Sequence, residues 1–275
     1  MLNEDIALAC KDMMKKGSSS FYHAFKFLPK KQREAVYVIY SFCRMIDDAV
    51  DEPENSPYTL DELEYHFNQL DEANGHFIWP ALRWVFSEYN LSKEPYYTQI
   101  SGQRLDYVRT TYQTMEELED YCYRVAGSVG EMLIPVLRDN ANKEFVEAGI
   151  YLGKAMQIVN IIRDIGADQK LGRRYVPLEL MEKYCYTEHE WRNQIVNDAL
   201  KDVIHDLTNK ADVWFSYGMQ YIDLYPPKSA LSMKLAAGYY REIIRVVREN
   251  DYHVFTERAI VTNKRKSQLL LQLTK

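Results

Sequence analysis

The sequence has few of the residues that build several common kinds of site. Its four cysteines are widely spaced and form no CxxC pair, which argues against a disulfide framework or a zinc site. The six histidines are scattered singly, and the eleven glycines form no phosphate loop or dinucleotide fingerprint. A net charge of −6 makes nucleic acid an unexpected partner.

Long apolar runs are absent as well. No uninterrupted apolar stretch approaches about 20 residues, so we expect no membrane span. Residues 1–17 are acidic early and lack the apolar core of a signal peptide. Together with cysteines typical of reduced thiols, this predicts a cytoplasmic protein.

What the sequence does contain is helical periodicity along almost its whole length. Asn3 is expected to cap a helix that runs to about Lys16, and Pro29 to open a long helix that ends before Pro53. Without alternating strands or a linker, we predict one all-α domain over residues 1–275, with roughly ten helices. Further signals for helix ends are capping boxes at Thr59, Thr114 and Thr187, a C-cap at Asn74–Gly75, and a break at Pro226–Pro227.

Two acidic clusters interrupt apolar helical stretches. In the first, Asp47 and Asp51 are four residues apart and therefore share one helix face. Taken alone, this cluster could equally be a solvated helix end. In the second, polar residues spaced by 3, 4 and 4 lie on one stripe of an isoleucine-rich helix: Gln157, Asn160, Asp164 and Asp168. A polar stripe on a core helix needs partners, either an internal hydrogen-bond network or a ligand.

Facing sets of carboxylate and amide oxygens suit Mg²⁺, which lets water and substrate phosphate complete its coordination. Arg44 and Arg163, one in each cluster, could hold the same phosphates by forked hydrogen bonds. The two clusters therefore predict chemistry on a diphosphate ester inside a helical cavity.

Three weaker signals have ordinary alternatives. Small residues between Tyr121 and Gly130 favour either a ligand or close helix packing. The Gly17–Ser20 tract could be a plain loop or a phosphate grip. The basic residues of Arg173–Tyr175 and Asn263–Lys266 could form a basic wall or a solvated surface. The apolar end of the tail is expected to pack as a final helix or to contact an anionic membrane.

Taken in order, these segments resemble the squalene/phytoene synthase family of head-to-head prenyl transferases. The resemblance is carried by Ser18-Ser19-Ser20-Phe21, Tyr40 to Asp51, Tyr121 to Gly130, Asn160 to Asp168, and Arg174-Tyr175-x-Pro177. Within the family, Ser20 to Phe25, Ile39-Tyr40 and Tyr252 to Lys266 are most similar to bacterial dehydrosqualene (4,4′-diapophytoene) synthases.

The resemblance implies an isoprenoid synthase fold with a central cavity, two or three Mg²⁺ ions and no NADPH. It implies metal ligands at Asp47, Asp51, Asn160, Asp164 and Asp168. It implies catalytic roles for these aspartates, Arg44 and Tyr121. It implies contacts to prenyl diphosphate by Gly17, Ser18, Ser19, Ser20, Phe21, Tyr40, Arg44, Gln157, Asn160, Arg163, Tyr240 and Arg258.

The implied reaction joins two farnesyl diphosphates through presqualene diphosphate to C30 dehydrosqualene, in carotenoid biosynthesis. Phe21 and Phe25 lie one helical turn apart and could floor a cavity that favours C15 substrates. The alternatives are a phytoene synthase on C20 substrates, a bacterial squalene or presqualene diphosphate synthase, and a non-catalytic helical assembly factor. A hydrocarbon product also suggests peripheral membrane contact and a downstream desaturase.

The chain departs from the family pattern at two positions. Ser19 stands where members often carry a lysine, so one phosphate contact is either missing or supplied by the late basic segment. Ala167 stands where glutamate is common, which removes a carboxylate beside the expected metal ligands.

Overall fold

Residues 2–273, the part described by this computed structural model, are helical and contain no strand. A single strand-like bridge joins Thr111 to Arg174. The elements in chain order are α1 (Glu4–Gly17), α2 (Ser19–Phe25), α3 (Lys30–Asp51), α4 (Leu60–Asn68), α5 (Ile78–Glu88), α6 (Glu94–Leu105), α7 (Met115–Cys122), the π-helix η1 (Tyr123–Gly127), α8 (Ser128–Leu137), α9 (Lys143–Lys170), α10 (Leu178–Lys183), α11 (Glu188–Arg192), α12 (Asp198–Gly218), the 3-10 helix η2 (Ile222–Leu224), α13 (Pro227–Glu249) and α14 (Asn263–Leu273). The predicted fold class is confirmed.

Most of the predicted helix ends are where the sequence signals put them. Asn3 caps α1 by accepting hydrogen bonds from the backbone of Asp5 and Ile6. Complete capping boxes begin α4 at Thr59 and α11 at Thr187. At Thr114 the cap forms without the box, because Glu117 accepts from the backbone N–H of Gln113 instead.

The predicted C-cap at Asn74–Gly75 is wrong. Helix α4 already ends at Asn68, and the chain reaches Gly75 through turns. Gly75 has a φ of +87°, so it serves a turn that leads into α5 rather than a helix end.

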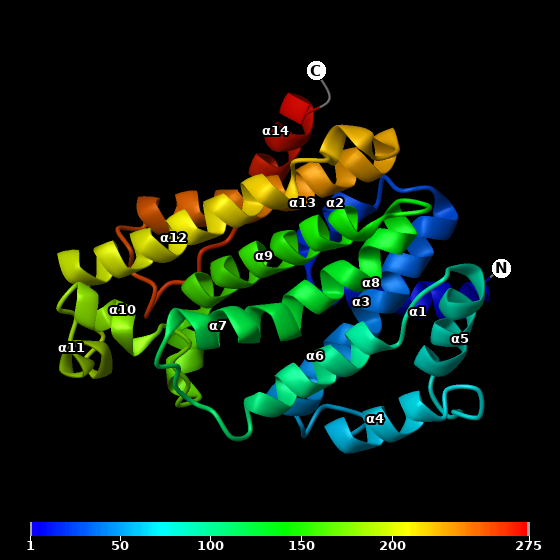
Figure 1. The fold of residues 1–275 in the computed structure, drawn as a ribbon, viewed down its shortest axis with the longest axis horizontal. Helices are drawn as coiled ribbons and strands as arrows, with labels where there is room; N and C mark the ends of the chain where they lie inside the picture. Colours follow the sequence, from blue (N-terminus) through cyan, green and yellow to red (C-terminus); the bar gives the residue numbers. More distant parts are fainter. Residues whose placement is uncertain (1, 274–275) are drawn as a thin grey trace.

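Helix α9 is the axis of the fold. In Figure 1 it runs through the middle of the molecule between α12 and α13 on one side and η1 and α8 on the other, and the packing contacts agree. By length and composition α9 is apolar enough to cross a membrane, but 56% of its most apolar window is buried inside the protein. It is therefore the core helix that its isoleucine-rich sequence predicts.

Small residues let α9 approach the η1–α8 segment closely. A Cβ added to Gly153 would lie 2.1 Å from the carbonyl oxygen of Ala126, and one added to Gly130 would lie 2.2 Å from that of Gly149. Close helix packing thus accounts for the small residues of the Tyr121–Gly130 segment, and Ala126 and Gly130 also line an internal cavity, so both alternatives from the sequence hold.

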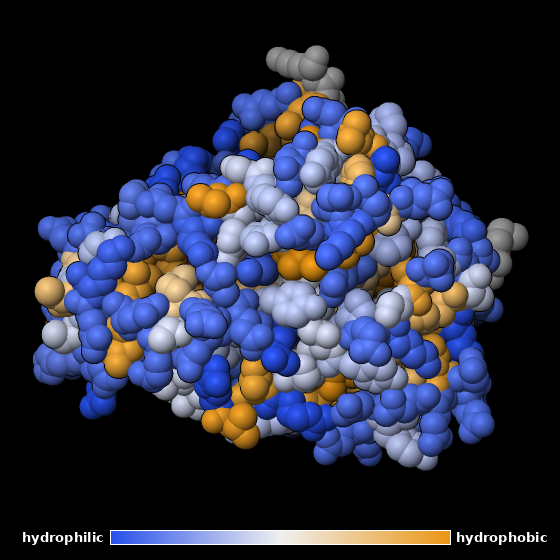
Figure 2. All heavy atoms as spheres, viewed as in Figure 1, coloured by the Kyte–Doolittle hydropathy of each residue, from blue (hydrophilic) through white to orange (hydrophobic). Residues whose placement is uncertain are grey.

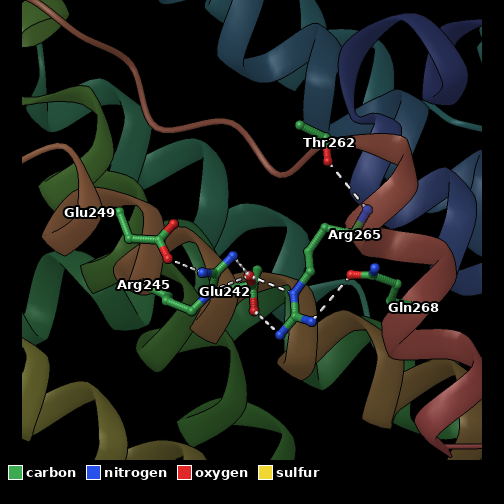
Figure 3. Close-up of polar contacts among 6 residues, drawn as sticks. All are labelled: Glu242, Arg245, Glu249, Thr262, Arg265 and Gln268. Atoms are coloured by element: carbon green, nitrogen blue, oxygen red, sulfur yellow. Dashed lines mark hydrogen bonds and ion pairs between the residues drawn. The ribbon is translucent and has the colours of Figure 1, made fainter.

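The C-terminal helix is joined to α13 by an ion-pair network centred on one buried carboxylate (Figure 3). Glu242 is 6% exposed and accepts hydrogen bonds from Arg245 on its own helix and Arg265 on α14. Of the two alternatives for the basic residues near the C-terminus, a solvated surface does not hold for Lys266, which is 3% exposed. Its Nζ donates to Ser19 at the start of α2, and its carbonyl oxygen accepts from Tyr239 of α13. Elsewhere, on the face drawn in Figure 2, the surface is mainly hydrophilic and its apolar atoms lie in separate groups.

The close approach of α9 to η1 predicts opposite effects for two glycine substitutions. Gly153→Ala should lower the free energy of unfolding by about 1–3 kcal/mol, because its methyl group collides with backbone. Gly238→Ala, in α13 with no atom within 4 Å of the added Cβ, should raise it by about 0.5–1 kcal/mol. Urea unfolding of both variants measures this, and equal effects would contradict the packing described.

Candidate active site

Three cavities meet at Asp47 on α3 and Asn160 on α9, which line all of them. The acidic chamber, about 200 Å³, contains both acidic clusters. The basic chamber, about 300 Å³, lies between the Gly17–Ser20 tract and the C-terminal segment. The apolar pocket, about 180 Å³, extends from the same junction between α2, α8, α9 and α13. The two polar chambers and the apolar pocket are thus continuous at Asp47 and Asn160.

The acidic chamber holds five carboxylates from three parts of the chain. Asp47 and Asp51 come from α3, Asp164 and Asp168 from α9, and Asp106 from the turn after α6. The helical spacing predicted that each pair shares a face, and the structure places both pairs on one cavity wall.

Burial and mutual repulsion make it costly to ionise the carboxylates of this chamber. Burial raises the pKa of Asp47 to about 8, with Arg44 opposing the shift and Asp51 adding to it. Burial and then repulsion from Asp164 raise the pKa of Asp168 to about 7. Burial likewise raises the pKa of Asp106 to about 6, although Arg173 opposes it.

Arginines compensate the remaining acids. Arg173 donates to Asp51 at 2.6 Å. Asp164 accepts from Arg163 at 3.0 Å and from Arg258 at 2.7 Å. Burial alone would raise the pKa of Asp164, but these two guanidinium groups outweigh it and hold the pKa below its ordinary value.

The residues of the acidic chamber fit a hard divalent cation. Within residues 2–273 no three His, Cys, Asp or Glu side chains are already gathered as a metal cluster. Asn160 Oδ1, however, is buried at the junction without a hydrogen-bond partner. The surrounding donors are carboxylate oxygens whose pKa values are raised mainly by burial, and oxygen donors of this kind are those that Mg²⁺ prefers.

The basic chamber brings together residues from both ends of the chain. Arg44, Arg163, Arg258 and Lys266 line it together with the Gly17–Ser20 tract. Lys266 Nζ donates to Ser19 Oγ at 2.7 Å, so an ammonium group lies beside the position where the serine tract lacks a lysine. Ser18 caps α2 by accepting from the backbone of Phe21. Gly17 lets Tyr40 approach closely here, because a Cβ would lie 2.4 Å from the hydroxyl of Tyr40, which would have to shift.

The apolar pocket is walled by aromatic and aliphatic side chains. Phe21 contacts Phe25 and Tyr240, with ring centroids 5.9 Å and 5.4 Å away. Phe21, Tyr40 and Tyr240 line both this pocket and the basic chamber, whereas Phe25 lines only the pocket. Gln157 lies between the pocket and the acidic chamber.

Comparison with known proteins explains the arrangement. A sequence model described as squalene/phytoene synthase matches residues 14–265. The chain belongs to the squalene/phytoene synthase family. Members are prenyltransferase-type synthases of isoprenoid and carotenoid biosynthesis that use prenyl diphosphates.

Individual relatives cover nearly the whole chain. A phytoene synthase of Arthrospira platensis is 32% identical, over 95% of this chain and 90% of its own. A 4,4′-diapophytoene synthase of Staphylococcus haemolyticus is 30% identical, over 97% and 95%. The crystal structure of a dehydrosqualene synthase in complex with ligand is 32% identical and superposes with a TM-score of 0.92, over 98% of this chain and 96% of the other.

Two residues of this family site went unrecognised in the sequence. Gln103 donates to Asp47 at 2.6 Å, and Asp106 accepts from Tyr121 at 3.0 Å and Tyr175 at 2.9 Å. A signal for them exists, because Gln99, Gln103 and Asp106 are spaced by 4 and 3. All three are buried, so α6 carries a third polar stripe that continues into the following turn.

The raised pKa of Asp168 predicts a pH-dependent gain in stability for Asp168→Asn. The folded protein holds this proton up to about pH 7, against an ordinary value of 3.8, so stability falls as pH rises through that window. In the metal-free protein the substitution should add about 1–2 kcal/mol at pH 8, after allowance for screening, and nearly nothing at pH 4.

Urea unfolding in the presence of a chelator at both pH values tests this expectation. Asp71→Asn, an exposed carboxylate outside the chamber, is the matched control and should change stability little at either pH. A gain for Asp168→Asn that is the same at pH 4 and pH 8 would contradict the electrostatic account.

Proposed function

We propose that the protein is a dehydrosqualene synthase, which joins two farnesyl diphosphates head to head through presqualene diphosphate. The observation that carries this proposal is the length of the apolar pocket. Its lining residues on α9 extend from Gly149 to Asn160, which are eleven residues apart, or about 16 Å at 1.5 Å per residue. At about 1.25 Å per bond an extended farnesyl chain needs about 14 Å and a geranylgeranyl chain about 19 Å.

In the proposed mechanism the basic chamber binds the diphosphate that leaves. Arg44, Arg163, Arg258 and Lys266 place positive charge where negative charge develops as the allylic C–O bond ionises. Asp47, Asp51, Asn160, Asp164 and Asp168 would hold two or three Mg²⁺ ions. When Mg²⁺ is bound, the charge on the leaving diphosphate is further neutralised.

The apolar pocket then controls the carbocation. The double bond of the second substrate attacks the allylic cation, and loss of one proton closes the cyclopropane of presqualene diphosphate. Ionisation of its C–O bond and rearrangement follow, and without a hydride donor a second proton is lost to give dehydrosqualene. Phe21, Tyr40 and Tyr240 at the junction exclude water that would trap the cation.

In this mechanism, the two protons are taken up by groups near the junction of the three cavities. Tyr121 is 3% exposed and donates to Asp106, so it is connected to a carboxylate that can take a proton. Tyr40 and Tyr240 lie on the other side, where burial raises the pKa of each hydroxyl and keeps it protonated. The released diphosphate is the remaining candidate base.

A second candidate is a phytoene synthase, favoured by relatives with that name at 32% identity. A squalene synthase of the same fold would need a hydride donor, which separates it by its dependence on NADPH. A non-catalytic assembly factor would have no need to keep both acidic clusters in one chamber.

The first prediction of this proposal concerns the product. Purified protein incubated with farnesyl diphosphate and Mg²⁺, without NADPH, should yield a C30 hydrocarbon with a conjugated triene, because the second cation can end only by proton loss. Mass and ultraviolet spectra of the extract identify it. A C40 product from geranylgeranyl diphosphate, in preference to C30 at equal substrate concentration, would overturn the C15 assignment.

The second prediction concerns pocket length. Phe25→Ala shortens a side chain that lines the pocket and should make room for a longer prenyl chain. Turnover of geranylgeranyl diphosphate relative to farnesyl diphosphate should rise by about tenfold, since contacts with one or two methylene groups in a pocket change the discrimination between two substrates by about that much. Phe27→Ala is the matched control, because Phe27 packs on the core without lining the pocket. An equal shift in both variants would argue against Phe25 as the limit of chain length.

A further inference from the structure

A fourth cavity, of about 450 Å³, lies at the C-terminal end of α9, between that helix end and α11. We call it the Arg174 cavity. Four cationic side chains and one carboxylate line it: Lys170, Arg173, Arg174, Arg192 and Glu188. Thr111, Gln169, Gly172, Trp191 and Gln194 complete the wall. Its lining therefore carries an excess of positive charge, in a protein whose net charge is −6.

Arg174 is the unusual member of this group. Its side chain is 6% exposed, yet among described residues its contacts are the sulfur of Met181 at 3.0 Å and Glu188 at 3.8 Å. A guanidinium has five N–H donors, and a thioether is a weak acceptor. The carboxylate of Glu188 is itself 53% exposed and bonds Arg192 more closely, at 3.0 Å. Arg174 thus lines the cavity with few protein acceptors within hydrogen-bond distance.

The burial of Arg174 is not explained by its role in the fold. Its backbone N–H donates to the carbonyl oxygen of Thr110 at 2.7 Å, and the backbone bridge to Thr111 needs no particular side chain. Burial also lowers the pKa of this guanidinium, with Glu188 only partly opposing the shift. An anion in the cavity would supply further acceptors for this guanidinium.

The surrounding groups favour the same occupant. Lys170 is exposed and forms no ion pair within the described part of the chain. The carbonyl groups that end α9 do not compete for these donors, because Leu171, Gly172 and Arg173 cap them with their own N–H groups. Gly172, with a φ of +74°, makes that turn possible.

Arg173 connects this cavity to the reaction. It lines both the acidic chamber and the Arg174 cavity, and donates to Asp51 on the chamber side. We propose that the Arg174 cavity is a second oxyanion site, which takes inorganic diphosphate once it has left the junction of the basic and acidic chambers. The identity of the anion as a reaction product rests on the proposed function, whereas the existence of the site does not.

The test is calorimetric titration of inorganic diphosphate into the metal-free, substrate-free protein at low ionic strength. Two classes of site are expected, one in the basic chamber and one in the Arg174 cavity. Arg258→Ala should weaken the first class only. Arg174→Met and Lys170→Ala should each weaken the second class, by about tenfold or more for Arg174, since a charge-assisted contact is lost.

Two further variants separate binding from folding. Glu188→Gln removes the competing carboxylate and should tighten the second class several-fold, a gain that a purely structural Arg174 does not predict. Lys228→Ala, an exposed lysine of α13 outside every cavity described here, is the matched control for Lys170→Ala and should change neither class. If Arg174→Met fails to fold, Lys170→Ala and Glu188→Gln decide the question.

A single class of site, or a second class that these variants leave unchanged, overturns the proposal. Orthophosphate should bind the second class at least about tenfold more weakly, because it offers fewer charged oxygens to the same cations. Equal affinity would overturn the assignment to diphosphate. Because the titration uses no prenyl substrate, its failure leaves the C30 reaction untouched, and absence of a C30 product leaves this site untouched.

Discussion

The structure depends on keeping like-charged carboxylates together on two apolar helices. Asp47 on α3 and Asp168 on α9 carry pKa values raised to about 8 and 7, so ionising them in the folded protein costs free energy. Arg163, Arg173 and other guanidinium groups compensate only part of that charge. In the proposed function, this incomplete compensation favours a bound cation, because a site that is fully neutralised internally has no reason to bind one.

The need to compensate these carboxylates with positive charge also explains why the two ends of the chain meet at the site. The segment after α13 lies against α9, where Gly166 donates to the carbonyl oxygen of Val254 and leaves no room for a Cβ beside Phe255. This contact brings Arg258 to Asp164. Farther along, Lys266 contacts Ser19, 247 residues away in sequence. The basic chamber is therefore assembled by tertiary packing rather than by any local motif.

The difference between a local motif and an arrangement made by tertiary packing decides which site residues could be predicted from the sequence. The stripe that contains Asn160 and Asp164 was recognisable because helical spacing alone puts such residues on one face. Gln103 and Asp106 follow the same rule in α6 and its turn, but only burial distinguishes their stripe from an ordinary solvated face. The ammonium group of Lys266 beside Ser19 has no local signature, since it depends on how α14 docks on α13. The Asn74–Gly75 cap failed because a glycine in a turn and a glycine after a helix look alike in sequence.

The proposed Mg²⁺ chemistry gives the raised pKa values a further meaning. A carboxylate must be deprotonated to bind a metal ion, so protons and Mg²⁺ compete for Asp47 and Asp168 near neutral pH. Binding of the cation would therefore release protons and strengthen as pH rises through 7 to 8. Since the apolar pocket joins the chamber at Asp47, a cation bound there in the proposed function would also fix where a prenyl diphosphate places its reacting carbon. The charge of the acidic chamber and the direction of the apolar pocket thus both follow from the positions of the carboxylates on α3 and α9.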